Sequence, residues 1–361
     1  MKLRTGFSTS ACAAAAASGA LIALETEQAI SAVTINLHMR QDIPFQLCRC
    51  EFNDGAVLCG VIKDAGDDPD VTNGLGIQAL VRRTELPGIK LLGGKGVGIV
   101  TLPGLPVEVG NPAINPGSRR LILRVIEQTL QRLQTNSQNG YEITIIVPEG
   151  EQIALQTMNP KLGIVGGISI LGTDGLVHPY SAPAFRTSLY YELKVAQGKG
   201  CSRVAFGTGK RSVDYLQKMF SQVDKIEYIS VGDELGFPID QAAKMGFQEI
   251  YIGGMIGKLS KVALGRFQTH VNEGKVDFEF LAALAEKAGA SLQACEAIRI
   301  ARTSRAVQNL LKKEGISLEA ELARMACREV YQRCKQDVSV KLCIFSLEGQ
   351  MLGYAEELSH D

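Results

Sequence analysis

The stretch RVAFGTG at residues 203–209 is a short apolar run that ends in two glycines. Two similar runs follow it, KIEYISVGDE at residues 225–234 and EIYIGG at residues 249–254. Their apolar cores predict strands, and the apolar spacing after each run predicts a helix: strands over 203–206, 225–231 and 249–252, and helices over 213–220, 239–245 and 257–264. Three successive units of strand, glycine turn and helix favour a parallel, doubly wound sheet. Helices continue to about Lys335, and residues 338–347 predict a late strand.

Upstream of this region the pattern is mixed. The chain has 361 residues, which is more than one usual domain, so we expect two. Residues 148–160 are polar and turn-prone and supply the expected boundary, giving domains over 1–150 and 151–361. The first domain is predicted to be α+β and the second Rossmann-like α/β. In the first domain we expect strands over 32–37, 45–51, 56–62, 77–81 and 143–147, with a turn at 53–55. A loop-rich stretch is expected over 86–117 and a helix over 119–133.

The apolar run over residues 11–24 superficially resembles a secretory signal, because Lys2 and Arg4 precede it. It is mostly alanine and is too short for a membrane span. Ser8, Thr9 and Ser10 stand where a helix N-cap belongs. We therefore interpret the run as a small-residue helix packed inside the protein, and we expect a cytoplasmic protein with no membrane partner.

The charge balance and the cysteine spacing argue against several classes of binding protein. Lysine plus arginine and aspartate plus glutamate number 38 each, which argues against a nucleic-acid or anionic-membrane binder. The nine cysteines form no C-x-x-C pair, and with four histidines no zinc-site spacing exists. Cys48, Cys50 and Cys59 could meet a soft metal, but buried small apolar side chains are the favoured interpretation. Unpaired thiols suit a reducing compartment.

The glycine turns predict a nucleoside site. In open parallel sheets ligands bind beyond the carboxyl ends of the strands, where Gly207-Thr208-Gly209 is expected. Asp233 ends the next strand, 24 residues after Gly209, and suits a ribose-binding acid. Ser212 stands where the dinucleotide fingerprint has its third glycine, which favours a nucleoside without phosphate over a pyrophosphate. Tight turns and an exposed acid remain the alternative.

Three other groups of residues leave their roles open. Asp64, Asp67, Asp68 and Asp70 surround Pro69, where a divalent cation, local turn bonds and a general base are all compatible with the pattern. The stretch GGKGVG at residues 93–98 fits an anion-binding loop and a plain connector equally well. His270, after Thr269, fits either a structural hydrogen bond or catalysis.

The opening RTGFST at residues 4–9, followed by an alanine-rich helix, resembles the CbiD family. Further similar stretches follow in order: KDAGDDPDVT (63–72), GGKGVG (93–98), LPGLP (102–106), NPAINP (111–116), NPKLGI (159–164), GGISILGT (166–173) and GKL (257–259). The resemblance runs from residue 4 to about residue 270. The chain departs from the family pattern at Ser10, usually glycine, at Met255, often histidine, at Gln268 and Val271, and in the glycine turn 207–210.

The resemblance implies a cobalt-precorrin-5B C(1)-methyltransferase of anaerobic cobalamin biosynthesis. Its methyl donor would be S-adenosylmethionine, a nucleoside without phosphate, and cobalt would arrive only inside the corrinoid substrate, with no metal site on the protein. We expect the cofactor to contact six residues of the second domain: Gly207, Thr208, Gly209, Asp233, Gly253 and Gly254. Basic side chains in or beside the glycine-rich loops, together with Thr269, are the candidates for binding the substrate carboxylates: Arg4, Lys95, Arg119, Arg120, Lys161 and Thr269.

Asp67, Asp68 and His270 are the candidates for orienting the ring or removing a proton. We expect the corrinoid on the first domain and its loops, with methyl transfer in a cleft between the domains. Two other functions stay open. A non-catalytic tetrapyrrole-binding protein would not need an acid for the ribose, and a nucleotide-dependent oxidoreductase would have the full glycine fingerprint.

Overall fold

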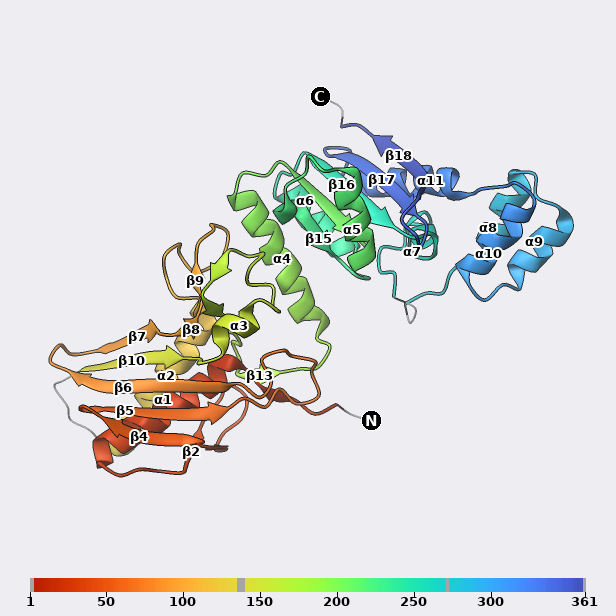
Figure 1. Ribbon diagram of the computed structural model, residues 1–361. Coiled ribbons are helices and arrows are strands. Elements are labelled where there is room, and N and C mark those ends of the chain that lie inside the picture. Colours follow the sequence, from red (N-terminus) through yellow and green to blue (C-terminus); the bar gives the residue numbers. More distant parts are fainter. Residues whose placement is uncertain (1–2, 135–139, 271–272, 360–361) are drawn as a thin grey trace. The chain divides into compact units, whose positions relative to one another are not determined.

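The computed structural model describes residues 3–134, 140–270 and 273–359 (Figure 1). The chain divides into two compact units, Met1–Ala182 and Pro183–Asp361. The division falls later than the boundary expected after residue 150, because the segment that follows pairs back onto the first unit. There β11 (Ile164–Val165) pairs with β9 (Ile99–Val100), and β12 (Gly167–Ile168) pairs with β8 (Gly96–Val97).

A five-stranded mixed sheet forms the centre of the first unit, in the order β4-β5-β6-β10-β7. Its strands are β4 (Arg49–Asn53), β5 (Ala56–Ile62), β6 (Gly76–Thr84), β10 (Gly140–Ile146) and β7 (Ile89–Gly93). All neighbours are antiparallel except β10 and β7. Two smaller pairs lie beside it, β2 (Ala32–Ile35) with β3 (Ile43–Gln46) and β1 (Gly6–Phe7) with β13 (Leu176–Val177).

Two expectations for this unit were wrong. The single strand expected over 45–51 is two strands, because Leu47 and Cys48 leave the ladder and donate their N–H groups to the carbonyls of Ser31 and Gly60. The expected loop over 86–117 contains three strands, β7, β8 and β9. The short helix α3 (Gly150–Ala154) lies in the polar segment 148–160, where the domain boundary is expected.

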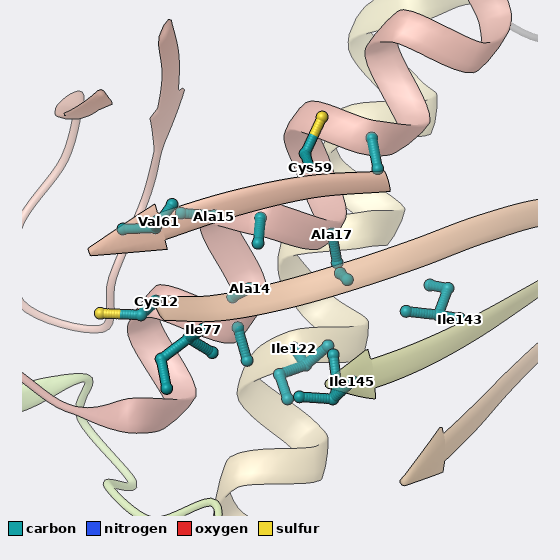
Figure 2. Packing of buried hydrophobic residues seen from close by; sticks show 14 of the residues in the cluster. Cys12, Ala14, Ala15, Ala17, Cys59, Val61, Ile77, Ile122, Ile143 and Ile145 are labelled. Carbon is teal, nitrogen blue, oxygen red and sulfur yellow. The ribbon is translucent and has the colours of Figure 1, made fainter. Parts of the chain in front are cut away.

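The alanine run forms helix α1 (Thr9–Thr26), and its expected burial is confirmed. Ser8 caps the helix by accepting a hydrogen bond from the N–H of Ala11. Figure 2 shows the small side chains of α1 against the strands that carry Val61, Ile77 and Ile145. Helix α2 (Pro116–Leu133) packs beside it, where the hydroxyls of Ser18 and Thr129 lie 2.7 Å apart. Among the described helices only α1 is long and apolar enough to cross a membrane, and 83% of that segment is buried inside the protein.

The second unit contains a five-stranded, mostly parallel sheet in the order β15-β14-β16-β17-β18, as the glycine-ended runs predicted. Its strands are β14 (Arg203–Gly207), β15 (Tyr228–Ser230), β16 (Glu249–Gly254), β17 (Ser339–Phe345) and β18 (Met351–Glu357). Only β18 is antiparallel to its neighbour. The helices are α4 (Ala182–Gly198), α5 (Lys210–Met219), α6 (Gly236–Lys244), α7 (Ile256–Val262), α8 (Phe278–Lys287), α9 (Leu292–Arg299), α10 (Ser304–Lys313) and α11 (Glu319–Arg333).

Helices cover both faces of this sheet. Val204 and Phe206 of β14 belong to a core cluster shared with α6 and α11, whereas Ala205 faces a second cluster that includes Leu216 of α5. Two details differ from expectation. The strand over 225–231 is shorter, because Asp224 and Glu227 form a capping box that sets residues 225–227 into a 3-10 turn. The late strand is followed by β18, which the sequence pattern did not reveal.

Candidate functional site

A cavity of about 720 Å³ lies at the carboxyl ends of the parallel strands in the second unit. Thr208 and Gly209 follow β14, Asp233 follows β15, Met255 follows β16 and Phe345 ends β17. The chain runs from β14 outward to β15 and then returns across β14 to β16. Such a reversal of strand order is where open parallel sheets bind their ligands.

Asp233 is the only carboxylate of this cavity wall, as far as the described residues go, and its position is fixed by two donors. Its Oδ1 accepts from Thr269 Oγ1 at 2.9 Å and lies 3.0 Å from Lys258 Nζ. Burial opposes ionisation, but the hydrogen bonds from Lys258 and Thr269 outweigh it, and the pKa of Asp233 is lowered. Both contacts are to Oδ1, and no residue in the described ranges donates a hydrogen bond to Oδ2, so this second oxygen is available to a ligand.

Lys258 connects Asp233 to the sheet through hydrogen bonds. Besides Asp233, its Nζ donates to the carbonyl oxygen of Thr208 at 2.7 Å and to that of Gly232 at 3.1 Å. The ammonium therefore joins the ends of β14 and β15. Sequence reasoning noted Lys258 only within the GKL stretch and missed its role. A lysine in the first turn of a helix is unfavourable because of the helix dipole, so the position of Lys258 could have indicated that it has a specific partner.

Lys261 lies one turn further along α7 and was also missed. Its side chain lines the cavity, although only 4% of the residue is exposed. Nζ donates to the carbonyl oxygen of Thr269 at 2.8 Å. Burial lowers the pKa of Lys261, and the nearby Asp233 charge opposes that shift. The cavity therefore contains a desolvated ammonium group.

The predicted cofactor glycines have two different surroundings. Gly209 lines the cavity, and a Cβ atom there would meet no atom within 4 Å. A Cβ on Gly207 would lie 2.6 Å from the backbone nitrogen of Val213, and one on Gly253 would lie 2.6 Å from the Leu216 side chain. A Cβ on Gly254 would lie 2.9 Å from Leu259. These three glycines let α5 and α7 approach the strand ends that shape the cavity.

Thr269 and His270 reach the cavity on a segment that pairs with the loop after β15. Glu234 and Gln268 form an antiparallel bridge, and the Gln268 amide donates to Glu234 at 2.6 Å. Thr269 is 2% exposed and donates both its N–H, at 3.0 Å, and its hydroxyl to Asp233. His270 is exposed at the wall. The structure thus brings together Thr208, Gly209, Asp233, Thr269 and His270 of the predicted set.

The other candidates lie in the first unit, where Arg4 contacts the aspartate loop. Its guanidinium donates to both oxygens of Asp64, at 2.5 and 2.8 Å, and its N–H donates to Asp67 Oδ2 at 2.6 Å. The Arg4 hydrogen bond, together with the N–H of Gly66, lowers the pKa of Asp64 to about 2. The predicted substrate ligand Arg4 is therefore held by this loop.

The remaining aspartates of the loop also accept hydrogen bonds. Asp68 Oδ1 accepts from the N–H of Tyr180 at 3.1 Å, and Asp70 accepts from the buried ammonium of Lys63 at 2.7 Å and from Thr72. Local turn bonds, one of the open alternatives, are thus present. Nowhere in the described ranges do three His, Cys, Asp or Glu side chains lie close enough to hold a metal ion.

The glycine stretch 93–98 packs closely against the backbone of residues 147–150 and does not form an open anion-binding loop. Gly96 has a φ of +74°, and a Cβ there would lie 1.8 Å from the carbonyl oxygen of Val147. A Cβ on Gly150 would lie 2.1 Å from the carbonyl of Gly96. The neighbouring basic candidates lie mostly at the surface: Lys95, Arg119 and Arg120 are exposed, and Lys161 is half-buried. Arg119 donates to the carbonyl of Leu91 at 3.3 Å.

Comparison with known proteins gives matches over both units. The family model "CbiD" matches residues 1–179, and "CbiD, C-terminal domain" matches residues 268–356. The cobalt-precorrin-5B C(1)-methyltransferase of Geobacillus kaustophilus is 41% identical over 99% of this chain and 96% of the relative. The protein of that name from Thermus thermophilus is 41% identical over 97% of this chain and 93% of the relative.

A crystal structure of the cobalamin biosynthesis protein cbiD from Archaeoglobus fulgidus is 30% identical and aligns with a TM-score of 0.40, covering 75% of this chain and 83% of that chain. The family resemblance of the opening stretch is confirmed by the family models and by relatives that match nearly the whole length. The chain belongs to the CbiD family, the family of the cobalt-precorrin-5B C(1)-methyltransferases.

Proposed function

We propose that this protein transfers a methyl group from S-adenosylmethionine to C-1 of cobalt-precorrin-5B, giving cobalt-precorrin-6A. The relatives that match almost its entire length carry the name of that methyltransferase. The observation that carries the cofactor assignment is Asp233, whose Oδ1 is fixed by Lys258 and Thr269 while Oδ2 is available at the sheet's switch point. A carboxylate in this position suits the hydroxyl groups of a ribose.

The residues present fit S-adenosylmethionine. Asp233 would accept from the ribose, and the ammonium group of Lys261, which has one carbonyl acceptor, would meet the methionine carboxylate. The cavity volume of about 720 Å³ falls within the usual range for small-molecule sites. We infer that the second unit binds its nucleoside at the switch point of a doubly wound sheet, although its strand order, 2-1-3-4-5 along the chain, differs from the 3-2-1-4-5-6 order of the expected Rossmann-like domain. The bound cofactor would supply an electrophilic methyl group, whose bond to sulfur breaks with the electron pair left on the sulfur.

The protein's contribution to the rate would be positioning. Lys258 bonds two strand-end carbonyls, so Asp233 is held before any ligand arrives, and such preorganisation favours in-line transfer. His270, exposed at the cavity wall, is the proposed proton acceptor of this unit. Asp67 and Asp68 are the corresponding proposals in the first unit, together with Arg4, Lys95, Arg119, Arg120 and Lys161 for the substrate carboxylates.

Incubation of the enzyme with cobalt-precorrin-5B and ¹³C-methyl-labelled S-adenosylmethionine tests the proposal. We expect a product heavier by one labelled methyl, and its ¹³C spectrum should place that methyl on C-1. A product of unchanged mass, or a methyl on another ring carbon, contradicts the assignment. Calorimetry with S-adenosylmethionine and with nicotinamide cofactors separates the methyltransferase from an oxidoreductase on the same sheet.

A further inference from the structure

The cavity of the second unit is strongly basic, although the chain as a whole is electrically balanced. Five cationic side chains line it against the single carboxylate of Asp233: Lys210, Arg211, Lys258, Lys261 and Arg305. Whole-chain counts of 38 basic and 38 acidic residues predict no such excess. The excess of positive charge is therefore a local property of this cavity.

The positions of three of these cations are unfavourable in the absence of an anion. Lys210 and Arg211 are in the first turn of α5, and Arg305 is in the first turn of α10. Neither first turn contains an acidic residue, and Gly209 provides no side-chain cap for α5. Helix N-termini carry partial positive charge and normally attract Asp and Glu rather than Lys and Arg. The two ten-residue helices thus add their own positive ends to a basic wall.

The same three cations, here called the basic rim, lack neutralising partners in the chain. Within the described part of the protein, Lys210, Arg211 and Arg305 enter no ion pair or side-chain hydrogen bond. All three are exposed. Behind them Lys261 is almost fully buried, and its ammonium donates to one carbonyl without forming an ion pair within the described ranges. Lys258, in contrast, is neutralised by Asp233.

We propose that the basic rim binds peripheral carboxylates of the corrinoid substrate beside the nucleoside held at Asp233. This inference rests on the proposed function. S-adenosylmethionine has one carboxylate and two cationic groups, so it cannot neutralise this wall. A tetrapyrrole with several acetate and propionate side chains can, because Arg binds carboxylates through charge-assisted, bidentate hydrogen bonds. The acidic edge of the ring would then contact the same unit as the cofactor.

Two corrinoids with the same ring test the inference by equilibrium binding to the full-length protein. Cobyrinic acid has free carboxylates, whereas cobinamide has amides in their place. We expect the double variant Arg211→Gln/Arg305→Gln to bind cobyrinic acid at least about tenfold more weakly than the wild type, from the loss of two charge-assisted contacts. Affinity for cobinamide and for S-adenosylmethionine should change less than about twofold. Arg302→Gln, which removes an exposed arginine outside the cavity wall, is the matched control.

Each other outcome has a definite meaning. Equal loss of S-adenosylmethionine affinity overturns the inference, because the rim then serves the cofactor's carboxylate. Unchanged affinity for cobyrinic acid also overturns it, as does an equal loss with Arg302→Gln. Inorganic pyrophosphate is a further probe. If it binds the wild type more tightly than cobyrinic acid does, and if the rim variant loses that binding, the site is a phosphate site and the inference is wrong. Rim-dependent binding of cobyrinic acid without methyl transfer would leave this inference standing and remove the proposed function.

Discussion

Lys258 Nζ lies 3.0 Å from Asp233 Oδ1 and also donates to the carbonyl groups that end two neighbouring strands. The pair therefore does more than neutralise an acid. It fixes the carboxylate with respect to β14 and β15, and it leaves the other carboxylate oxygen available at the point where the strand order reverses. An isolated surface ion pair would be expected to contribute little. The effect of this pair should appear in ligand binding rather than in stability.

Replacement of Asp233 should weaken cofactor binding. Asp233→Ala removes the proposed ribose acceptor, and we expect S-adenosylmethionine affinity to fall by about 1.5–3 kcal/mol, the range for hydrogen bonds to charged groups. Asp214→Ala removes an exposed acid of α5 outside the cavity wall and serves as control. Calorimetry on folded variants measures both. Equal affinity of Asp233→Ala and wild type would move the cofactor elsewhere.

Lys258 should set the pH dependence of that binding. The pKa of Asp233 is below its usual value of 3.8, so the carboxylate stays ionised down to that pH and the affinity should hold there. Lys258→Met removes both a hydrogen bond and a positive charge, so the pKa of Asp233 rises. Binding by the variant should then begin to decline at a higher pH than binding by the wild type. Identical pH profiles of S-adenosylmethionine affinity would show that Lys258 does not control this acid.

Arg4 should influence acid stability through Asp64. Because the folded-state pKa of Asp64 is lowered to about 2, its stabilising contribution is present above 3.8 and disappears as the pH falls through about 2. Arg4→Gln removes the main cause, although the hydrogen bond from Gly66 remains. The variant should be less stable than wild type above pH 3.8, and the two melting temperatures should converge in stronger acid. A constant difference across this range would contradict the linkage.

Asp68→Asn separates a chemical role from a structural one. Asparagine keeps a carbonyl oxygen that can accept from the N–H of Tyr180, so the melting temperature should not change. If Asp68 orients the ring or takes a proton, as we propose, single-turnover methyl transfer should fall by about tenfold or more. Asp68→Ala, which removes the acceptor as well, should also lower the melting temperature. Wild-type turnover in a stable Asp68→Asn protein would exclude Asp68 from the chemistry.

Gly96 and Gly55 form a matched pair for testing close packing. Their φ angles are +74° and +76°, but a Cβ would meet Val147 O at 1.8 Å in the first case and nothing within 4 Å in the second. Gly55→Ala should cost only the left-handed backbone penalty, roughly 1–2 kcal/mol. Gly96→Ala adds a backbone clash, and we expect about 4 kcal/mol or more. Denaturant unfolding compares them, and equal losses would refute the packing role.

The parallel sheet could be predicted because its signal is local. Each of the three strand runs within residues 203–254 is followed by glycine and then by a helix, so the parallel topology of this part can be predicted from the local sequence. Asp233 could be singled out for the same reason, since it stands in the glycine turn after one of these strands. The strands β7 and β18 were missed because they depend on partners, β10 and β17, rather than on an alternating pattern of their own.

The cationic part of the cavity could not be predicted, because distant helices assemble it. Arg305 and Lys210 are 95 positions apart, and the packing of α10 against α7 brings Arg305 to the wall that Lys210 of α5 also lines. Lys261 and Thr269 share a hydrogen bond that no spacing rule reveals. The aspartate loop was ambiguous for a related reason. Its partners, Arg4 and Tyr180, lie on opposite sides of it in the sequence.

The pairing of β1 with β13 has a consequence for how the protein is made on the ribosome. Strand β1 cannot find its partner until residues 176–177 have been synthesised, and α1 lacks the strand β10 that completes its sheet until residue 146. At usual elongation rates this delay is roughly ten to thirty seconds. During that interval β5 and β6, complete by residue 84, can cover only part of the alanine-rich helix, which is apolar enough to span a membrane. Nascent chains of this protein should therefore depend on chaperones chiefly before residue 177 emerges.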